Sequence, residues 1–139
     1  MTANPVHLEI ELDPELPKDG SGTGSYSAGG KIGGVVQLRT DEPEKCRQLN
    51  VVIAWHLDVP PHWMGRKSPN RTWTQNSLVL HEGPLTHGNQ EFRFSSDLPE
   101  SPQSFKGDLL DISWTVEAWL DMGGEKEQLA TAPFRMVIP

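Results

Sequence analysis

The sequence predicts an all-β protein, an antiparallel β-sandwich of about seven strands. Apolar and polar residues alternate with a two-residue period along most of the chain, which is typical of strands that bury one face. The 13 glycines and 12 prolines are scattered between the alternating segments, as turns between short strands require. No segment shows an apolar stripe with the 3.6-residue period of a helix.

Seven segments carry this alternation and are predicted to form the strands. They are Pro5–Asp13, Ile32–Leu38, Leu49–Asp58, Trp73–His81, Asn89–Pro99, Leu110–Asp121 and Leu129–Pro139. The segment 49–58 has apolar residues on both faces, which predicts a central strand. Gly34 lies inside the second segment and predicts a bulge or a close backbone approach. The glycine-rich stretch Lys18–Gly30 is predicted to be a flexible turn or loop.

A stiff connector precedes the longest alternating segment. Pro99 and Pro102 fix φ and lack amide donors, so these residues cannot extend the preceding strand. We expect the connector to cross from one sheet to the other, with Phe105 closing one end of the core. The residues predicted to form the core are Trp55, Phe92, Phe94, Phe105, Ile112, Trp114 and Phe134.

The formal net charge of −7 argues against nucleic acid as a main partner, because phosphate binding needs a basic surface. The charge is uneven, since residues 39–71 hold six basic and four acidic side chains. No apolar run is long enough to cross a bilayer, and the N-terminus does not resemble a signal peptide. With a single cysteine, Cys46, no intrachain disulfide can form. These features predict a cytoplasmic protein without a transmembrane segment.

Several motifs follow one another in a defined order. They are "YSAGGKIGGVVQL" (Tyr26–Leu38), "CRQLNVVIAW" (Cys46–Trp55), "LHEGPLTHGNQEFRFSSDLP" (Leu80–Pro99), and "LPESPQSFKG" (Leu98–Gly107) with "DISWTVEAWLD" after it. In order and spacing these motifs resemble the arrestin-like domain family. The resemblance covers most of the chain, from residue 6 to residue 138.

The resemblance implies an immunoglobulin-like, arrestin-like sandwich that occupies residues 1–139 as one domain. Members of this family are mostly non-enzymatic adaptors and scaffolds, which bind proteins through sandwich edges and loops. The chain is similar to a single lobe, as in the arrestin N-terminal domain and in bacterial sporulation-control proteins, whereas the family generally pairs two sandwiches. A second copy would supply the missing companion, so we expect a homodimer or a larger homo-oligomer.

Sequence patterns for chemistry are weak. The pairs His56/His62 and His81/His87 could meet as metal ligands, but neither spacing matches a tight metal motif. No nucleophile motif or phosphate-binding loop is present. We therefore expect no catalysis, no cofactor and no metal. A metal-dependent enzyme that uses these histidines stays as an alternative.

One stretch predicts a partner-binding loop. Residues 62–73, "HWMGRKSPNRTW", hold three cations and two tryptophans but no acidic side chain. Arginine and tryptophan are enriched at binding hot spots. The candidate partner-binding residues are Trp63, Arg66, Lys67, Arg71 and Trp73, with Trp119 as an outward-facing addition. The partner expected for the loop is an acidic peptide or an anionic membrane surface. A sandwich that binds a carbohydrate or another small ligand through exposed tryptophans is the alternative.

Overall fold

Nine strands and one short 3-10 turn make up the elements of the computed structural model, which describes residues 6–13, 24–58, 71–107, 110–124 and 127–137. The strands are β1 (His7–Leu12), β2 (Ser25–Ser27), β3 (Lys31–Arg39), β4 (Gln48–Asp58), β5 (Arg71–Glu82), β6 (Asn89–Asp97), β7 (Phe105–Lys106), β8 (Asp111–Asp121) and β9 (Glu127–Val137). The turn η1 (Pro43–Lys45) precedes β4. The described residues contain no α-helix, and the all-β prediction is confirmed.

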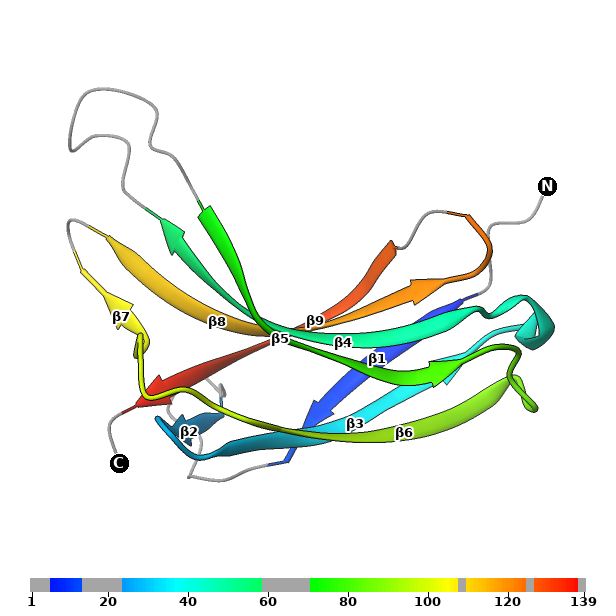
Figure 1. Cartoon of the computed structure of the whole chain (residues 1–139), viewed down its shortest axis with the longest axis horizontal. Coiled ribbons are helices and arrows are strands. Elements are labelled where there is room, and N and C mark those ends of the chain that lie inside the picture. The colour runs from blue at the N-terminus through cyan, green and yellow to red at the C-terminus, as the bar shows by residue number, and fades with distance from the viewer. Residues whose placement is uncertain (1–5, 14–23, 59–70, 108–109, 125–126, 138–139) are drawn as a thin grey trace.

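The strands form two sheets that pack face to face (Figure 1). The smaller sheet has the order β1-β3-β6, and the larger has the order β2-β9-β8-β4-β5 with β7 added to β8. All pairings are antiparallel except β2 with β9, which is parallel. β4 lies between β8 and β5, so the prediction that it is an internal strand is confirmed.

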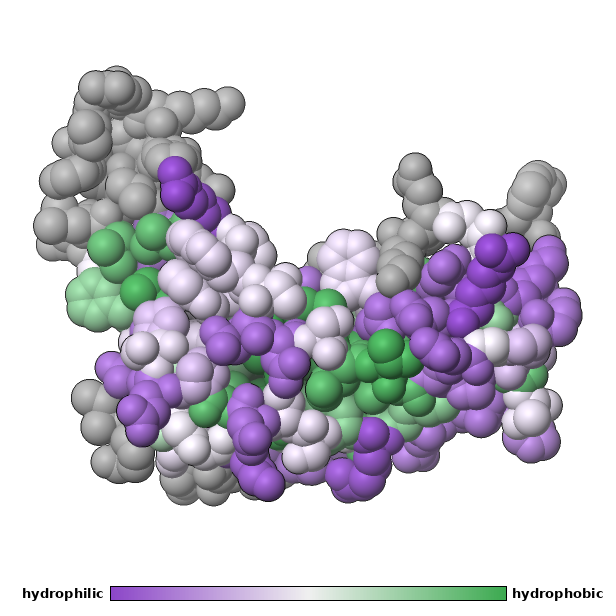
Figure 2. Space-filling view, viewed as in Figure 1, coloured by the Kyte–Doolittle hydropathy of each residue, from purple (hydrophilic) through white to green (hydrophobic). Residues whose placement is uncertain are grey.

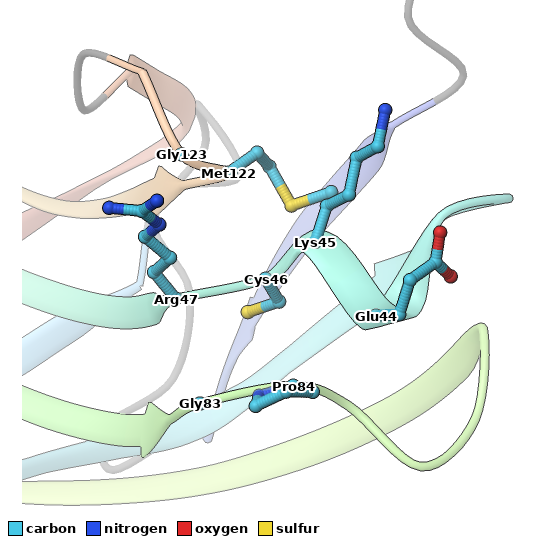
Figure 3. Close-up of a pocket in the computed structure, with 8 residues that line it drawn as sticks. All are labelled: Glu44, Lys45, Cys46, Arg47, Gly83, Pro84, Met122 and Gly123. Carbon is cyan, nitrogen blue, oxygen red and sulfur yellow. The ribbon is translucent and has the colours of Figure 1, made fainter.

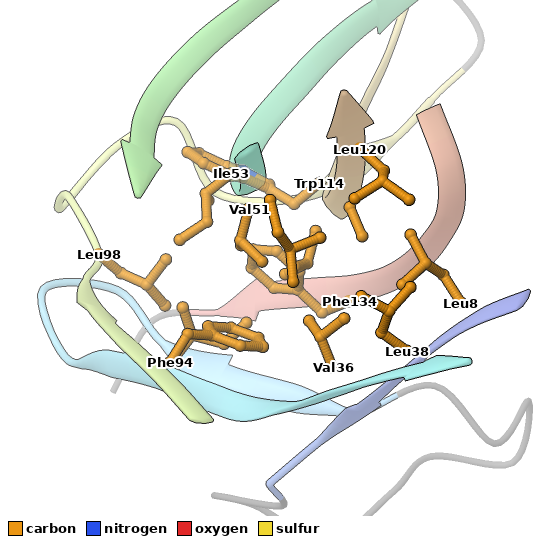
Figure 4. Close-up of a cluster of buried hydrophobic side chains, with 14 of the residues drawn as sticks. Leu8, Val36, Leu38, Val51, Ile53, Phe94, Leu98, Trp114, Leu120 and Phe134 are labelled. Carbon is orange, nitrogen blue, oxygen red and sulfur yellow. The ribbon is translucent and has the colours of Figure 1, made fainter. Parts of the chain in front are cut away.

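The core lies between the sheets, where the inward side chains of both meet (Figure 4). Val36 and Leu38 of β3 and Phe94 of β6 face Val51 and Ile53 of β4. The buried cluster also includes Leu8, Tyr26, Ile32, Leu49, Leu98, Trp114, Val116, Leu120, Phe134 and Met136. Burial of these apolar side chains is the main term that holds the sheets together.

Two of the nine strands were not predicted. The stretch Lys18–Gly30, expected to be a flexible turn or loop, contains β2 in its described part, from residue 24 onward. Tyr26 is buried there, its ring meets Phe134 edge-on, and its hydroxyl donates a hydrogen bond to the carbonyl of Asp13. A single aromatic residue among glycines and serines has no alternation around it, so this strand gives no periodic signal.

The connector between β6 and β8 crosses from the smaller sheet to the larger, as predicted. Backbone hydrogen bonds fix its two ends: Gly29 N–H donates to Pro99 O, and Ser104 N–H donates to Met136 O. The Ser104 hydroxyl accepts a second bond from the Met136 N–H at 2.8 Å. The indole N–H of Trp114 donates to Pro102 O at 2.8 Å. The connector is therefore tied both to β9 and to the core.

The prediction that Phe105 closes the core is wrong, because its side chain is 54% exposed. β7 pairs with the first residues of β8, and the Phe105 ring lies against the backbone of Gly107 rather than between the sheets. Ile112, its partner in register, is half-buried and outside the core cluster, so that prediction is also wrong. The other predicted core residues agree better with the structure. Phe94, Trp114 and Phe134 are buried, and Trp55 and Phe92 are half-buried against the cluster.

Gly34 marks a close backbone approach, as one of the two predicted alternatives states. It pairs with Leu12 of β1 on one side and with Phe94 of β6 on the other. A Cβ at this position would lie 2.4 Å from the carbonyl oxygen of Glu11 and 3.1 Å from the Phe94 ring. Only glycine allows the three strands of the smaller sheet to approach this closely.

The larger sheet bends away from the smaller sheet at both ends, so its outer face is concave (Figure 1). The space-filling view shows the resulting hollow between two raised ends (Figure 2). Side chains on the concave side of a sheet crowd together. Glu117, which the alternation of β8 places on this outer face, is only 8% exposed.

Candidate interaction surface

A row of aromatic rings in contact crosses the larger sheet. The row runs Trp73, Trp55, Trp114, Phe134 and Tyr26, one residue from each of β5, β4, β8, β9 and β2. Trp73 and Trp55 stack with ring centroids 4.1 Å apart, and the centroids of Trp55 and Trp114 are 6.4 Å apart. The row starts at the surface and ends in the core, since Trp73 is 36% exposed and Trp114 is 0% exposed. Trp73 therefore has a structural contact on one ring face.

The predicted partner-binding residues fall into three groups. Trp63, Arg66 and Lys67 lie outside the described residues, so their role stays a prediction. Arg71 is the first residue of β5, and Trp73 is the third. Trp119 lies in β8 opposite Asn50 of β4, on the outer face, whereas Trp73 belongs to the aromatic row on the inner face. The structure therefore does not bring the two tryptophans together.

A chain of polar side chains crosses the concave face. The His56 ring lies between two hydroxyls, with Nδ1 2.9 Å from Thr72 Oγ1 and Nε2 2.9 Å from Thr115 Oγ1. The Thr115 hydroxyl donates to Glu117 Oε2 at 3.2 Å, so its oxygen accepts from the His56 Nε2–H. The Trp119 indole N–H donates to Glu117 Oε1 at 3.1 Å.

Glu117 is a buried acid with one nearby cation-forming group in the described part of the chain. His56 Nε2 lies 3.7 Å from Glu117 Oε2, and the Glu117 side chain is 10% exposed. A buried carboxylate requires hydrogen bonds or a counter-charge, because burial removes its hydration. This network was not predicted, since cross-strand neighbours depend on register. The only sequence signal for it was the alternation that places Glu117 and Trp119 on one face.

A second polar chain lies beside the first. Asn50 Nδ2 donates to Gln48 Oε1 at 3.0 Å, and Gln48 Nε2 donates to Glu82 Oε1 at 3.2 Å. Asn50 is 9% exposed, and its Oδ1 is buried without a hydrogen-bond partner among the residues that the structure describes. A buried acceptor without a donor is unfavourable by about 1–3 kcal/mol. This oxygen has almost no accessible surface, so a donor group reaches it only if the Asn50 side chain moves.

β5 differs from the other edge strands among the described residues. β1 and β6 are the edge strands of the smaller sheet, since each pairs only with β3 among the described strands. β1 carries exposed Glu9 and Glu11, and β6 carries exposed Glu91 and Arg93. β2 is only three residues long. β5 has twelve residues, with no Asp, Glu, Lys, Arg, Pro or Gly between Arg71 and Glu82. Charged side chains and short length are the usual means by which edges avoid pairing with other chains.

A pocket of about 440 Å³ lies at one end of the molecule, where η1 meets the residues after β5 and β8 (Figure 3). Lys45 and Arg47 line it together with Gly83, Met122 and the buried Cys46. Burial raises the pKa of the Cys46 thiol, and the nearby Asp121 carboxylate raises it further. The thiol is therefore protonated at neutral pH and is not an activated nucleophile.

The histidines that can be placed have separate partners. His81 Nε2 donates to Pro84 O at 3.1 Å, its ring lies against Phe92, and His56 belongs to the polar chain on the concave face. His87 is exposed, and His62 lies outside the described residues. Among the residues that the structure places, no three His, Cys, Asp or Glu side chains are grouped to hold a metal ion. Within the same part of the chain, no helix has the length and apolarity needed to span a membrane.

Comparison with known proteins shows the fold. A similar structure is Spo0M, a sporulation control protein from Bacillus subtilis, with a TM-score of 0.68 and 15% identity over 97% of this chain and 50% of that chain. The chain thus spans half the length of Spo0M, and the arrestin-like fold predicted from the sequence is confirmed. The alkylpurine DNA glycosylase AlkC from Pseudomonas fluorescens matches with a TM-score of 0.43 and 14% identity, over 96% of this chain and 30% of that chain. No protein-family model and no curated protein matches the sequence.

Proposed function

We propose that the chain is a non-catalytic protein-interaction module, an adaptor or scaffold of the arrestin-like class, which receives an extended segment of a partner protein along β5. The structural similarity to Spo0M, a sporulation control protein, supports a regulatory role. The observation that carries the proposal is the β5 edge, which lacks the internal charges present on β1 and β6. Strand addition to such an edge supplies backbone hydrogen bonds to the partner.

The part of β5 open to strand addition is short. The register with β4 shifts between Leu49 and Asn50 and again between Ile53 and Ala54. These shifts leave Leu80 and Gln75 of β5 without partners in register, and bulges of this kind bend an edge and interrupt pairing. Residues 76–79 lie between the two bulges, and Val79 among them is 54% exposed. We expect the partner segment to pair there.

Placing a charge on this edge should remove the partner. A Ser77→Lys variant puts an ammonium group between the bulges, where an incoming strand would have to desolvate it. Tagged wild-type and variant proteins are captured from the native cell, and their partners are quantified by mass spectrometry. The expected result is loss of a defined set of partners from Ser77→Lys with an unchanged melting temperature.

The matched control is Ser95→Lys on β6. Ser95 is also an exposed serine of an edge strand, but its edge already carries charged side chains. The control should retain the partners that Ser77→Lys loses. Equal recovery of all partners by both folded variants would contradict docking at β5. The homodimer stays a prediction. Binding of an acidic peptide or an anionic membrane surface by residues 62–73 also stays a prediction. A second copy of the chain among the lost partners would identify the homodimer.

A further inference from the structure

We propose that the concave face beside β5 binds an arginine side chain of the partner segment. This inference rests on the proposed function, because the arginine is carried by the segment that pairs with β5. The site is a block of six outer-face side chains, two from each of three adjacent strands. The concave block consists of Ser77 and Val79 of β5, Asn50 and Val52 of β4, and Glu117 and Trp119 of β8.

Register places these six side chains side by side. Val52 lies opposite Ser77 on one side and Glu117 on the other. Asn50 lies in the same way between Val79 and Trp119. Strands in a sheet are about 4.8 Å apart, so a strand added to β5 has Asn50 on the second strand inward and Glu117 on the third. A long side chain on the added strand extends over β5 towards these two residues, whereas a short one does not pass β5.

The block and its surroundings favour a cation. Its acceptors are the Glu117 carboxylate, the exposed Ser77 hydroxyl and the buried Oδ1 of Asn50, which has no partner among the described residues. The strands β8, β4 and β5 together contain five acidic residues and no lysine, and their one arginine, Arg71, is the first residue of β5. His56 is the only cation-forming group placed within 4 Å of Glu117 in the described chain. A bound guanidinium would therefore meet acceptors and negative charge.

The remaining side chains of the block suit the apolar part of an arginine. Val79 is 54% exposed, and Val52 is half-buried beside it. Arginine and lysine lay their methylene groups on apolar surface while the charged end stays with polar partners. The half-buried indole of Trp119 adds a ring face for a guanidinium. Arginine suits the block better than lysine, because its planar group presents several donors to separate acceptors at once.

A pair of synthetic peptides tests the proposal with the purified protein. The first is acetyl-Thr-Val-Arg-Val-Thr-amide, and the second replaces arginine with citrulline, which has a similar shape but no charge. Affinities are measured by titration calorimetry. We expect the arginine peptide to bind about tenfold more tightly, the effect of a charge-assisted hydrogen bond. Because no native partner is needed, this result is independent of the capture experiment with Ser77→Lys.

Two variants separate the concave block from the overall negative charge. Glu117→Gln should bind both peptides equally, whereas Glu91→Gln, which removes an exposed acid from the smaller sheet, should keep the preference for arginine. Equal affinity of the wild-type protein for the two peptides, or an unchanged preference in Glu117→Gln, would overturn the proposal.

A second measurement applies whether or not Glu117→Gln folds. In an NMR titration of the wild-type protein, the arginine peptide should mainly shift the backbone amide signals of residues 77–79 and Asn50. It should also shift the indole N–H signal of Trp119. Shifts centred on other residues would overturn the arginine site. Loss of partners from Ser77→Lys would still support docking at β5 in that case.

Discussion

Replacing Trp114 with alanine is expected to lower the free energy of unfolding by about 3–5 kcal/mol. Trp114 is 0% exposed and lies in the middle of the aromatic row, between Trp55 and Phe134. Its indole N–H also holds the connector through Pro102 O. The substitution therefore opens a cavity and leaves a connector carbonyl without its donor. Urea denaturation at equilibrium measures the loss, with the slope showing whether unfolding stays two-state.

The control is Trp73→Ala at the exposed end of the same row. Trp73 contributes one stacked contact, with Trp55, and already meets solvent. Its removal leaves no closed cavity, so the loss of stability should be clearly smaller than for Trp114. Equal losses at the two positions would contradict the burial order of the row. A loss below about 1 kcal/mol at Trp114, the size of a minor core change, would contradict the core itself.

Gly34→Ala is expected to destabilise the protein by about 1–3 kcal/mol or more, as overpacking does. The added methyl group would lie 2.4 Å from the Glu11 carbonyl oxygen, so β1 and β3 would have to separate. Backbone atoms cannot rotate aside as a side chain can. The same denaturation experiment measures this effect.

Gly124→Ala provides the matched control for this substitution. None of the described residues beyond its chain neighbours lies within 4 Å of a Cβ at Gly124, so the same added methyl group should leave stability nearly unchanged. Equal free energies of unfolding for Gly34→Ala and Gly124→Ala would contradict the close pairing of β1 with β3. Amide exchange in β1 would then show weak protection in the wild-type protein as well.

The long strands could be predicted from sequence because each exposes a run of alternating side chains. Leu8, Val36, Ile53 and Phe94 all lie on the inner faces that their alternation indicates. β2 and β7 could not be predicted, since three and two residues are too few for a period to appear. The prediction that Phe105 closes the core rests on its place at the end of the proline-held connector. Its place beside Gly107, away from the core, is a result of pairing with β8.

The candidate surface was less accessible to sequence reasoning than the fold. Trp119 was correctly placed away from the core cluster, but its neighbours Glu117 and Asn50 were not recognised. Those neighbours depend on which strands are adjacent and on their register, and neither follows from local alternation. The position of β5 at the edge of the described sheet was missed for the same reason, because a strand is an edge only by its place in the sheet.

Photo-crosslinking from β5 tests the central claim most directly. A benzoylphenylalanine probe replaces Ser77 on β5 or, as the control, Ser95 on β6, and cells that produce the protein are irradiated. Docking at β5 predicts a covalent adduct with a partner protein from position 77 that is absent from position 95. Adducts of the same proteins from position 95 alone, or no adduct from position 77, would contradict the claim that β5 is where the partner binds.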